Sequence, residues 1–214
     1  TYIPLKRGTV EREAVNIAIG IRSDGGKEVL DFSVAPNENG EAWRELLESL
    51  RNRGIEQVQL FIADGFIGLE NVIAEIYPTA KFQRCLVHVL RNLTSHVRKS
   101  DMRDLMSEFK EIRQSESLEE AKHALDNFIL KWKSKYSNQM RKLGKLSNLF
   151  TFYEFPPSIR ASIYSTNLIE AFNKKLKKKI RQKEQFPNED ALQRFVTTQI
   201  LEYNDKFEER AHRG

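Results

Sequence analysis

The sequence predicts an α/β protein in which helices cover a mixed sheet. Two observations lead to this prediction. Residues 1–85 carry strand and helix patterns in the order β-β-β-α-β-α-β, and residues 100–153 carry only the spacing of amphipathic helices. We therefore expect a sheet domain, formed by residues 1–99 and 156–214, that is interrupted by a helical insertion at residues 100–155.

Three strands are expected first, at residues 1–6, 14–21 and 28–34. The second is rich in small and β-branched residues, the third alternates between two faces, and turn residues at 23–26 separate them. Tight turns make these strands an antiparallel meander. A helix follows at residues 41–53, where apolar residues recur at helical spacing until Gly54.

Two further strands alternate with a helix. Residues 57–63 form an apolar run of the kind that fills a strand buried on both faces, and the run ends in Asp64-Gly65. A helix at residues 68–76 and a strand at residues 80–85 complete the sheet. Ligand sites in such folds gather at the carboxyl ends of the parallel strands, so Asp64 is a candidate site residue.

The later elements are helices. Ser100 is the expected N-cap of the first, and Ser117-Leu118-Glu119-Glu120 has the spacing of a capping box for the second. A break at Phe155-Pro156-Pro157 precedes a helix expected at residues 167–183, and Pro187-Asn188 opens the last helix.

Composition excludes several classes of protein. With 40% hydrophobic and 30% charged residues and few Gly and Pro, the 214-residue chain is neither disordered nor collagen-like, and no apolar run approaches the ~20 residues of a membrane span. A single cysteine, Cys85, excludes an intrachain disulfide and favours the cytoplasm or nucleus. The chain begins at Thr1 without a leader, so we expect it to be the interior of a longer protein.

The positive charge of the chain, formally +5, is concentrated in one lysine run. Residues 171–183 contain no acid and seven bases: Lys174, Lys175, Lys177, Lys178, Lys179, Arg181 and Lys183. Without these seven, 28 of the 35 bases remain against 30 acids. Because such a helix face is destabilised by repulsion between like charges, we expect it to meet a polyanion such as a phosphate backbone.

Two carboxylates stand beside these features. Asp64 follows an apolar strand, and Glu170 lies at the edge of an apolar helical seam, on the same face as Asn173, Lys174 and Lys177. Each could be an ordinary strand-end or helix-surface acid. Together they supply hard oxygen ligands for Mg²⁺ next to cations for a nucleic-acid strand, which favours two-metal phosphoryl chemistry.

Four stretches of the sequence resemble the catalytic domain of the Mutator-like (IS256-type) transposases: Phe61-Ile62-Ala63-Asp64-Gly65, Arg84-Cys85-Leu86-Val87-His88, Phe155-Pro156-Pro157-Ser158-Ile159-Arg160 and Ile163-Tyr164-Ser165-Thr166-Asn167-Leu168-Ile169-Glu170-Ala171-Phe172-Asn173. The resemblance runs from Thr1 to about Tyr203. It implies a ribonuclease-H-like fold, namely a mixed five-stranded sheet flanked by helices, with an all-α insertion before the last catalytic helix. It also implies a DDE triad of carboxylates that binds two Mg²⁺ or Mn²⁺ ions, which activate water to cut DNA and then the freed 3′-hydroxyl to join it to a target.

The resemblance implies that Asp64 is the second carboxylate of the triad and Glu170 the third. The first stands in an Asp-x-Thr-Tyr pattern, of which this chain has Thr1-Tyr2. That Asp would fall two positions before Thr1, so the fragment is expected to be inactive without it. Asp31 is the nearby acid that could be proposed as a substitute, and we prefer to interpret it as a surface-facing strand acid.

Polar residues near these carboxylates are expected to support the metal site or to face DNA. The resemblance implies this role for Cys85 and His88, and we extend it to Asn167 and Asn173. A structural zinc ion on Cys85 and His88 is disfavoured, because His96 or His123 would have to complete the site.

DNA binding is expected from Arg84, from Trp132 and from six bases of the lysine run: Lys174, Lys175, Lys177, Lys178, Lys179 and Arg181. Trp132 has two interpretations. We prefer that of a core residue in the stripe of Leu125 and Phe128, and the resemblance suggests stacking on an unpaired base at the transposon end. Many members of the family carry a second Trp where this chain has Leu146.

The function predicted on these grounds is that of a transposase catalytic core, with metal-dependent strand cleavage and strand transfer at transposon ends. The alternative is a non-catalytic nucleic-acid-binding module derived from a transposase. The expected partners are double-stranded DNA, as transposon ends and target, and at least one further copy of the protein, with no membrane. The expected location is the bacterial cytoplasm, at the nucleoid, or the nucleus in a eukaryote.

Overall fold

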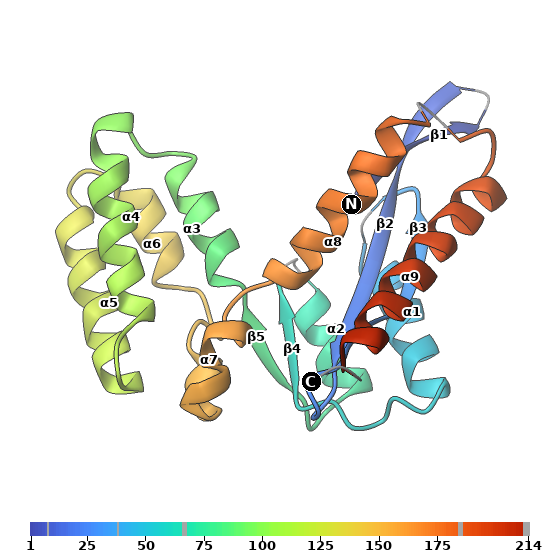
Figure 1. Cartoon of the computed structure of the whole chain (residues 1–214). Helices are drawn as coiled ribbons and strands as arrows, with labels where there is room; N and C mark the ends of the chain where they lie inside the picture. Colours follow the sequence, from blue (N-terminus) through green and yellow to red (C-terminus); the bar gives the residue numbers. More distant parts are fainter. Residues whose placement is uncertain (8, 38, 66–67, 184–185, 212–214) are drawn as a thin grey trace. The chain divides into compact units, whose positions relative to one another are not determined.

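The chain forms two compact units in the computed structural model, which describes residues 1–7, 9–37, 39–65, 68–183 and 186–211 (Figure 1). The first unit comprises Thr1–Gln57, Ile67–Pro78 and Asn167–Gly214, and the second comprises Val58–Phe66 and Thr79–Thr166. The structure is a mixed α/β protein that is mostly helical with small sheets, which confirms the predicted class at this level.

The first unit contains a three-stranded antiparallel sheet in the order β1-β2-β3. Its strands are β1 (Tyr2–Arg7), β2 (Thr9–Ile21) and β3 (Lys27–Ala35), so the predicted meander is confirmed. β2 begins five residues before its predicted start, because it pairs with β1 from Arg7↔Thr9 to Tyr2↔Ala14. Charged residues in that part of β2 give no apolar strand pattern, so the sequence does not reveal a strand that pairing with β1 stabilises.

One face of this sheet carries the apolar core of the first unit. Val15 and Ile17 of β2 pack in one cluster with residues of α8 (Asn167–Arg181) and α9 (Glu189–Ala211), and Figure 1 shows both helices beside the strands. The seam predicted for α8 is confirmed by the buried side chains Phe172, Leu176 and Ile180. α9 begins after Asn188, whose side-chain oxygen accepts a hydrogen bond from the Ala191 N–H at 2.8 Å.

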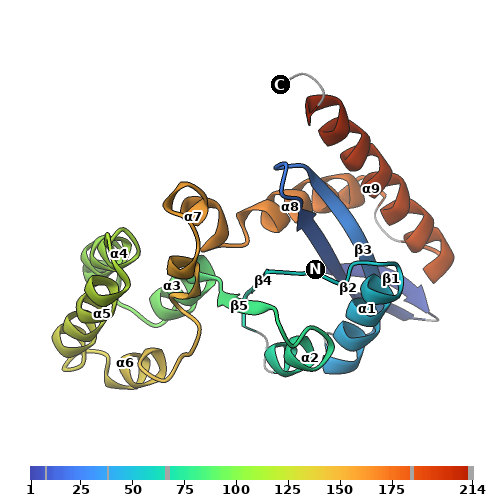
Figure 2. The ribbon, with the colours of Figure 1, turned by 90° about the horizontal axis from the view of Figure 1, so that it is seen from below.

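The opposite face of the sheet is covered by α1 (Gly40–Asn52), which contacts β3. The Ser49 hydroxyl donates to the Asp31 carboxylate at 2.7 Å, and Arg53 lies 3.3 Å from the same carboxylate. Asp31 is therefore a partly buried link between β3 and α1, with a side chain that is 22% exposed, and the interpretation as a surface-facing acid is wrong. In Figure 2, α1 lies beside α2 (Leu69–Ile76), which it contacts.

The second unit contains a pair of parallel strands, β4 (Leu60–Ala63) and β5 (Lys81–Arg84). β4 is shorter than predicted, and its four residues are half-buried where the apolar run predicted burial on both faces. α3 (Leu86–Thr94) was not predicted by the sequence. Its N-cap is Cys85, which makes no side-chain capping bond, so no Ser, Thr, Asp or Asn marks the start of this helix.

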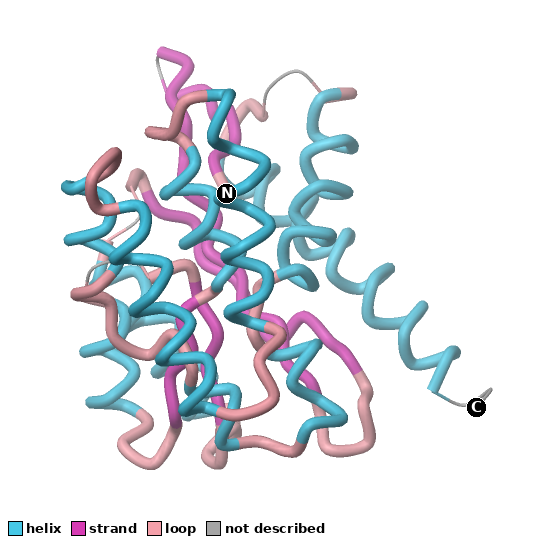
Figure 3. The backbone as a smooth tube through the Cα atoms, turned by 90° about the vertical axis from the view of Figure 1, so that its left-hand side faces the viewer, coloured by secondary structure: helices cyan, strands magenta, loops and turns pink. Residues whose placement is uncertain are grey.

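The rest of the second unit is helical, as predicted (Figure 3). Its elements are α4 (Lys99–Arg113), α5 (Leu118–Trp132), α6 (Ser137–Leu143), the 3₁₀ turn η1 (Thr151–Glu154) and α7 (Pro157–Ile163). Ser117 caps α5, because its hydroxyl accepts from the Glu120 N–H at 3.2 Å. The N-cap of α4 is Arg98, so the prediction that Ser100 caps this helix is wrong.

The hydrogen-bonded ladders of the described residues form a three-stranded and a two-stranded sheet. The predicted five-stranded sheet is therefore not seen as one continuous ladder in this part of the chain. No helix among the described residues is long and apolar enough to cross a membrane.

Asn204 of α9 binds both backbone groups of Val29 on β3, with its side-chain oxygen accepting at 2.8 Å and its amide donating at 3.1 Å. Asn204→Ala leaves both groups of a buried strand residue without a partner, so we expect the free energy of unfolding to fall by about 2 kcal/mol. Chemical denaturation measures this change. Asp205→Ala, at an exposed position of the same helix, should change it by less than about 0.5 kcal/mol; equal effects of the two variants would contradict the prediction.

Candidate functional site

Asp64 lies in a turn at the carboxyl end of β4, and hydrogen bonds hold the backbone of this turn. Its side chain is exposed, and the next residue, Gly65, has a φ of +80°, which favours glycine. The Arg84 guanidinium donates to the carbonyl of Gly65 at 3.2 Å and to that of Ser147 at 3.3 Å. Because β4 and β5 are parallel and Ala63 is opposite Arg84, both strands end at this edge. The structure thus places Arg84 beside the Asp64 turn.

Arg84 was predicted to bind DNA. In the structure its side chain bridges two backbone carbonyls, and its N–H donates to the Asn148 carbonyl at 2.9 Å. These bonds give Arg84 a supporting task at the Asp64 turn. Contact with DNA stays a prediction.

Cys85, His88 and Thr166 form a polar cluster directly after β5. The Cys85 sulfur accepts hydrogen bonds from the N–H and the hydroxyl of Thr166, each at 3.3 Å, and lies 3.2 Å from Nδ1 of His88. The Cys85 N–H donates to the Ala63 carbonyl at 2.7 Å. The cluster therefore joins the residue before Asp64 to the start of α3 and to Thr166, although these positions are distant in sequence.

The environment of the Cys85 thiol changes its acidity. Burial raises its pKa, but the hydrogen bonds from His88 and Thr166 favour the thiolate and prevail, so that the pKa falls to about 7. The residue is fully buried, which withholds the sulfur from solvent. Its position fits the predicted supporting role, which stays a prediction.

The two histidines considered for a zinc site have partners within their own segments. His96, after α3, lies 2.8 Å from the Ser95 hydroxyl through Nδ1. His123, on α5, lies 2.9 Å from the Asn127 amide.

Glu170 lies in the first turn of α8, in the first unit, and is half-buried. Asn167, the first residue of the helix, is exposed. One turn after Glu170, the side-chain oxygen of Asn173 is buried and has no hydrogen-bond partner among the residues that the structure describes. A buried amide oxygen without a partner is a polar group that a bound ligand or water would satisfy.

The lysine run covers the exposed side of α8, and its six predicted DNA-binding bases are all exposed. Lys179 forms an ion pair with Glu202 of α9, so the run has one acidic partner from another helix. The sequence of α8 alone does not reveal this compensation.

The described residues do not make up a complete two-metal site. Asp64 belongs to the second unit and Glu170 to the first. No group of three or more His, Cys, Asp or Glu side chains within the described ranges could hold a metal ion.

Trp132 lies in the core of the second unit and is 5% exposed. Its ring packs against Phe128 and Tyr136, with centroids 6.4 and 6.0 Å away, and its indole N–H donates to Glu108 at 3.0 Å. This burial agrees with the preferred core interpretation. Stacking on a DNA base stays a prediction.

Sequence reasoning missed Gln83, a fully buried polar residue of β5. Its amide donates to the Leu149 carbonyl at 2.9 Å, and its side-chain oxygen accepts from the Phe152 N–H at 2.8 Å. Gln83 thereby fastens the segment before α7 to β5. A polar residue in a short strand resembles a surface position, so no local signal identifies it.

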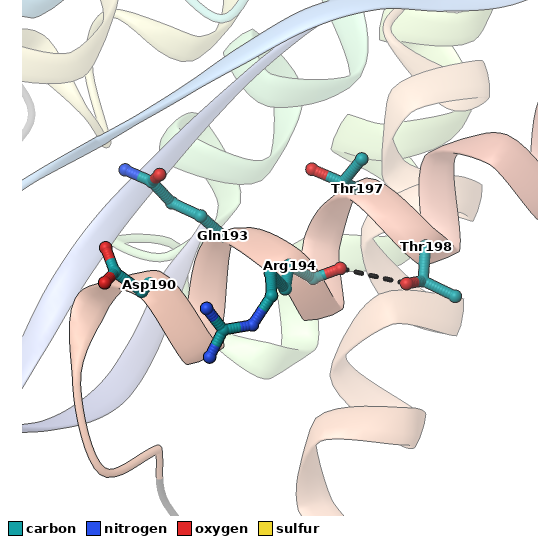
Figure 4. Close-up of a pocket in the computed structure, with 5 residues that line it drawn as sticks. All are labelled: Asp190, Gln193, Arg194, Thr197 and Thr198. Atoms are coloured by element: carbon teal, nitrogen blue, oxygen red, sulfur yellow. Dashed lines mark hydrogen bonds between the residues drawn. The ribbon is translucent and has the colours of Figure 1, made fainter.

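A surface hollow on α9 offers no second site. Its lining residues, Asp190, Gln193, Arg194, Thr197 and Thr198, come from successive turns of this one helix (Figure 4). The Thr198 hydroxyl donates to the carbonyl of Arg194 at 2.9 Å, an ordinary bond within a helix.

The Arg84 side chain lies so close to Gly65 that no larger residue fits at this position of the turn without moving it. A Cβ at Gly65 would overlap the Arg84 guanidinium, whereas a Cβ at Gly54, with a φ of +94°, would meet nothing within 4 Å. Gly54→Ala should therefore lower the free energy of unfolding by about 1 kcal/mol, the cost of the left-handed conformation, and Gly65→Ala by about 2 kcal/mol. The excess should vanish in an Arg84→Ala background; an excess that persists there would show that Arg84 is not its cause.

The lowered pKa of Cys85 predicts a pH-dependent contribution to stability. Because the folded pKa of about 7 lies below the ordinary value of 9.0, the contribution is complete above pH 9 and is lost as the pH falls through 7. The free energy of unfolding of the wild type, minus that of Cys85→Ser, should rise between pH 7 and 9 by at most about 3 kcal/mol. A difference that stays flat in denaturation at several pH values would contradict a stabilised thiolate.

Comparison with known proteins identifies the family of this chain. Residues 1–210 match the family described as "Transposase, Mutator family". The chain is 50% identical, over its whole length and 55% of the relative's, to the transposase for insertion sequence element IS905 of Lactococcus lactis. It is 49% identical to the transposase for IS1201 of Lactobacillus helveticus, over 95% of this chain and 55% of that protein.

A more distant relative is the transposase for IS256 in transposon Tn4001 of Staphylococcus aureus, which is 27% identical over 96% of this chain and 54% of its own length. The chain thus spans about half the length of these curated relatives. With a family match over nearly every residue, the chain belongs to the Mutator family of transposases.

Proposed function

We propose that this chain is the catalytic core of a DDE transposase, which cleaves DNA at transposon ends and transfers the cut strands to a target. The observation that carries the proposal is the position of Asp64, an acid at a strand end in a turn whose backbone is held by hydrogen bonds. Asp64 is exposed at the carboxyl edge of a parallel strand pair, and both Arg84 and Cys85 bind the backbone on either side of it. Reactive groups gather at such edges, and the relatives in this family are named transposases.

Asp64 and Glu170 are the proposed metal ligands, with two Mg²⁺ or Mn²⁺ ions in the complete site. Carboxylate oxygens are the ligands that these ions prefer, and the unpartnered Asn173 oxygen marks the helical turn after Glu170 as able to accept a further polar group. A bound pair of ions would stabilise charge on the scissile phosphate and activate the attacking oxygen. The first carboxylate of the triad is proposed to stand two positions before Thr1, so that these 214 residues alone are inactive.

The proposed fold is ribonuclease-H-like, with a mixed five-stranded sheet. An antiparallel meander followed by a parallel pair, in the order seen for β1 to β5, supports it. Residues 1–99 and 156–214 are the proposed core of this fold, and residues 100–155 the proposed insertion. The cluster of Cys85, His88 and Thr166, together with Asn167, is proposed to support the carboxylates.

The proposed partner is double-stranded DNA, both as transposon ends and as target. Exposed bases of the lysine run on α8 support it, because they present a row of cations to a phosphate backbone. Arg84 is a proposed further contact. Strand transfer of two ends calls for at least a homodimer, and the proposed location is the bacterial cytoplasm at the nucleoid.

The metal assignment is tested in the longer protein that carries the residues before Thr1. Asp64→Asn and Glu170→Gln should each reduce Mg²⁺- or Mn²⁺-dependent nicking and joining of a transposon-end duplex about a thousandfold, because each removes a charge that holds the ions. DNA binding should be retained. Asp126→Asn, at an exposed acid of α5, is the matched control and should keep full activity.

Full activity of both site variants would show the assignment to be wrong. A wild-type protein that binds transposon ends but neither nicks nor joins them with either metal would favour the alternative function, a non-catalytic DNA-binding module.

A further inference from the structure

The helical part of the second unit separates its charges along the chain. Residues 97–126 contain eight acids and six bases, whereas residues 127–153 contain six bases and no acid. The six are Lys131, Lys133, Lys135, Arg141, Lys142 and Lys145, and all are exposed. They lie at the end of α5, in the turn that follows, on α6 and just beyond it. We call these six residues the insertion bases.

Acids of α4 neutralise only part of this set. Lys131 pairs with Glu108 at 2.7 Å and Lys135 with Asp101 at 3.1 Å. Arg141 binds the neutral side chain of Asn138 at 2.9 Å.

The other three, Lys133, Lys142 and Lys145, have no ion pair in the part of the chain that the structure describes. Attraction to a helix C-terminus accounts for bases in the last turn of α6, namely Arg141 and Lys142. The same attraction applies to Lys133, the C-cap residue of α5. It does not account for Lys145, which follows the C-cap Gly144 of α6, nor for the absence of acids over 27 residues.

The insertion bases are linked to the turn that carries Asp64 through Ser147 and the Arg84 side chain. Lys145 is two residues before Ser147, whose carbonyl accepts from the Arg84 side chain. The same guanidinium binds the carbonyl of Gly65, next to Asp64. All these residues belong to the second unit, so the surface and the candidate carboxylate share one scaffold.

We propose that the insertion bases form a second surface for the phosphate backbone of duplex DNA, in addition to the lysine run on α8. The inference rests on the proposed function and names a binding surface within it. Charge complementarity selects the partner, because six exposed cations, of which Lys131 and Lys135 are paired with acids, attract a polyanion and repel a basic partner. Its link to the Asp64 turn would hold the bound backbone next to the carboxylate.

The test measures binding of this chain to a duplex by fluorescence anisotropy at several NaCl concentrations. The insertion variant carries Lys133→Gln, Lys142→Gln and Lys145→Gln. Its matched control carries Arg103→Gln, Lys110→Gln and Lys122→Gln, which remove the same charge from exposed positions of α4 and α5. A third variant carries Lys174→Gln, Lys175→Gln and Lys177→Gln on α8, and thermal melts verify that each variant is folded.

The insertion variant should bind about tenfold more weakly at 0.1 M salt than the control. Its slope of log K against log salt should be smaller in magnitude by about 2 to 3, since each lost phosphate contact removes about 0.9.

This inference would be overturned, and the proposed function left intact, if the insertion variant had the slope and affinity of the control and only the α8 variant bound more weakly. If Asp64→Asn and Glu170→Gln both keep full metal-dependent activity while the insertion variant still binds DNA weakly, only the proposed function would be overturned. Tighter binding of polyglutamate than of duplex, sensitive to the insertion variant, would overturn DNA in favour of an acidic protein segment.

Discussion

The hydrogen bond from the Cys85 N–H to the Ala63 carbonyl, 2.7 Å long, fixes the strand edge on which the second unit's candidate site depends. It continues the parallel ladder past Arg84, so that Asp64 leaves β4 beside an anchored backbone. The side chain of Cys85 then binds Thr166, and the N–H of Arg84 binds Asn148. Three segments distant in sequence therefore meet at the end of β5.

Charge in this protein is organised by tertiary neighbours as much as by the sequence. The lysine run of α8 and the insertion bases are both acid-free stretches of the chain, yet acids from adjacent helices reach into each. Glu202 of α9 pairs with Lys179, and Asp101 of α4 pairs with Lys135. What remains uncompensated, such as Lys133 and Lys145, is the charge available to a polyanion, and a formal net charge of +5 conceals it.

The elements that the sequence predicted well are those with a local signal. Ser117 and Asn188 cap α5 and α9 through bonds that span three residues, and the apolar seam of α8 repeats within one helix. Elements with a distant cause were missed. α3 starts at a cysteine that makes no capping bond. At the start of α4, the Arg98 N–H donates to the hydroxyl of Tyr136, 38 residues away, and no residue near Ser100 signals that bond.

The sequence by itself indicated the family, the order of elements from β1 to β5, and the two candidate carboxylates, because motifs and periodicity are properties of neighbouring residues. Tertiary structure alone decided the partners: Asp31 lies under α1, the Trp132 indole binds Glu108, and Arg84 holds the backbone of Gly65. An apolar or charged pattern states which face of an element is buried or exposed. It does not state which distant residue meets that face, because that choice depends on how the whole chain packs.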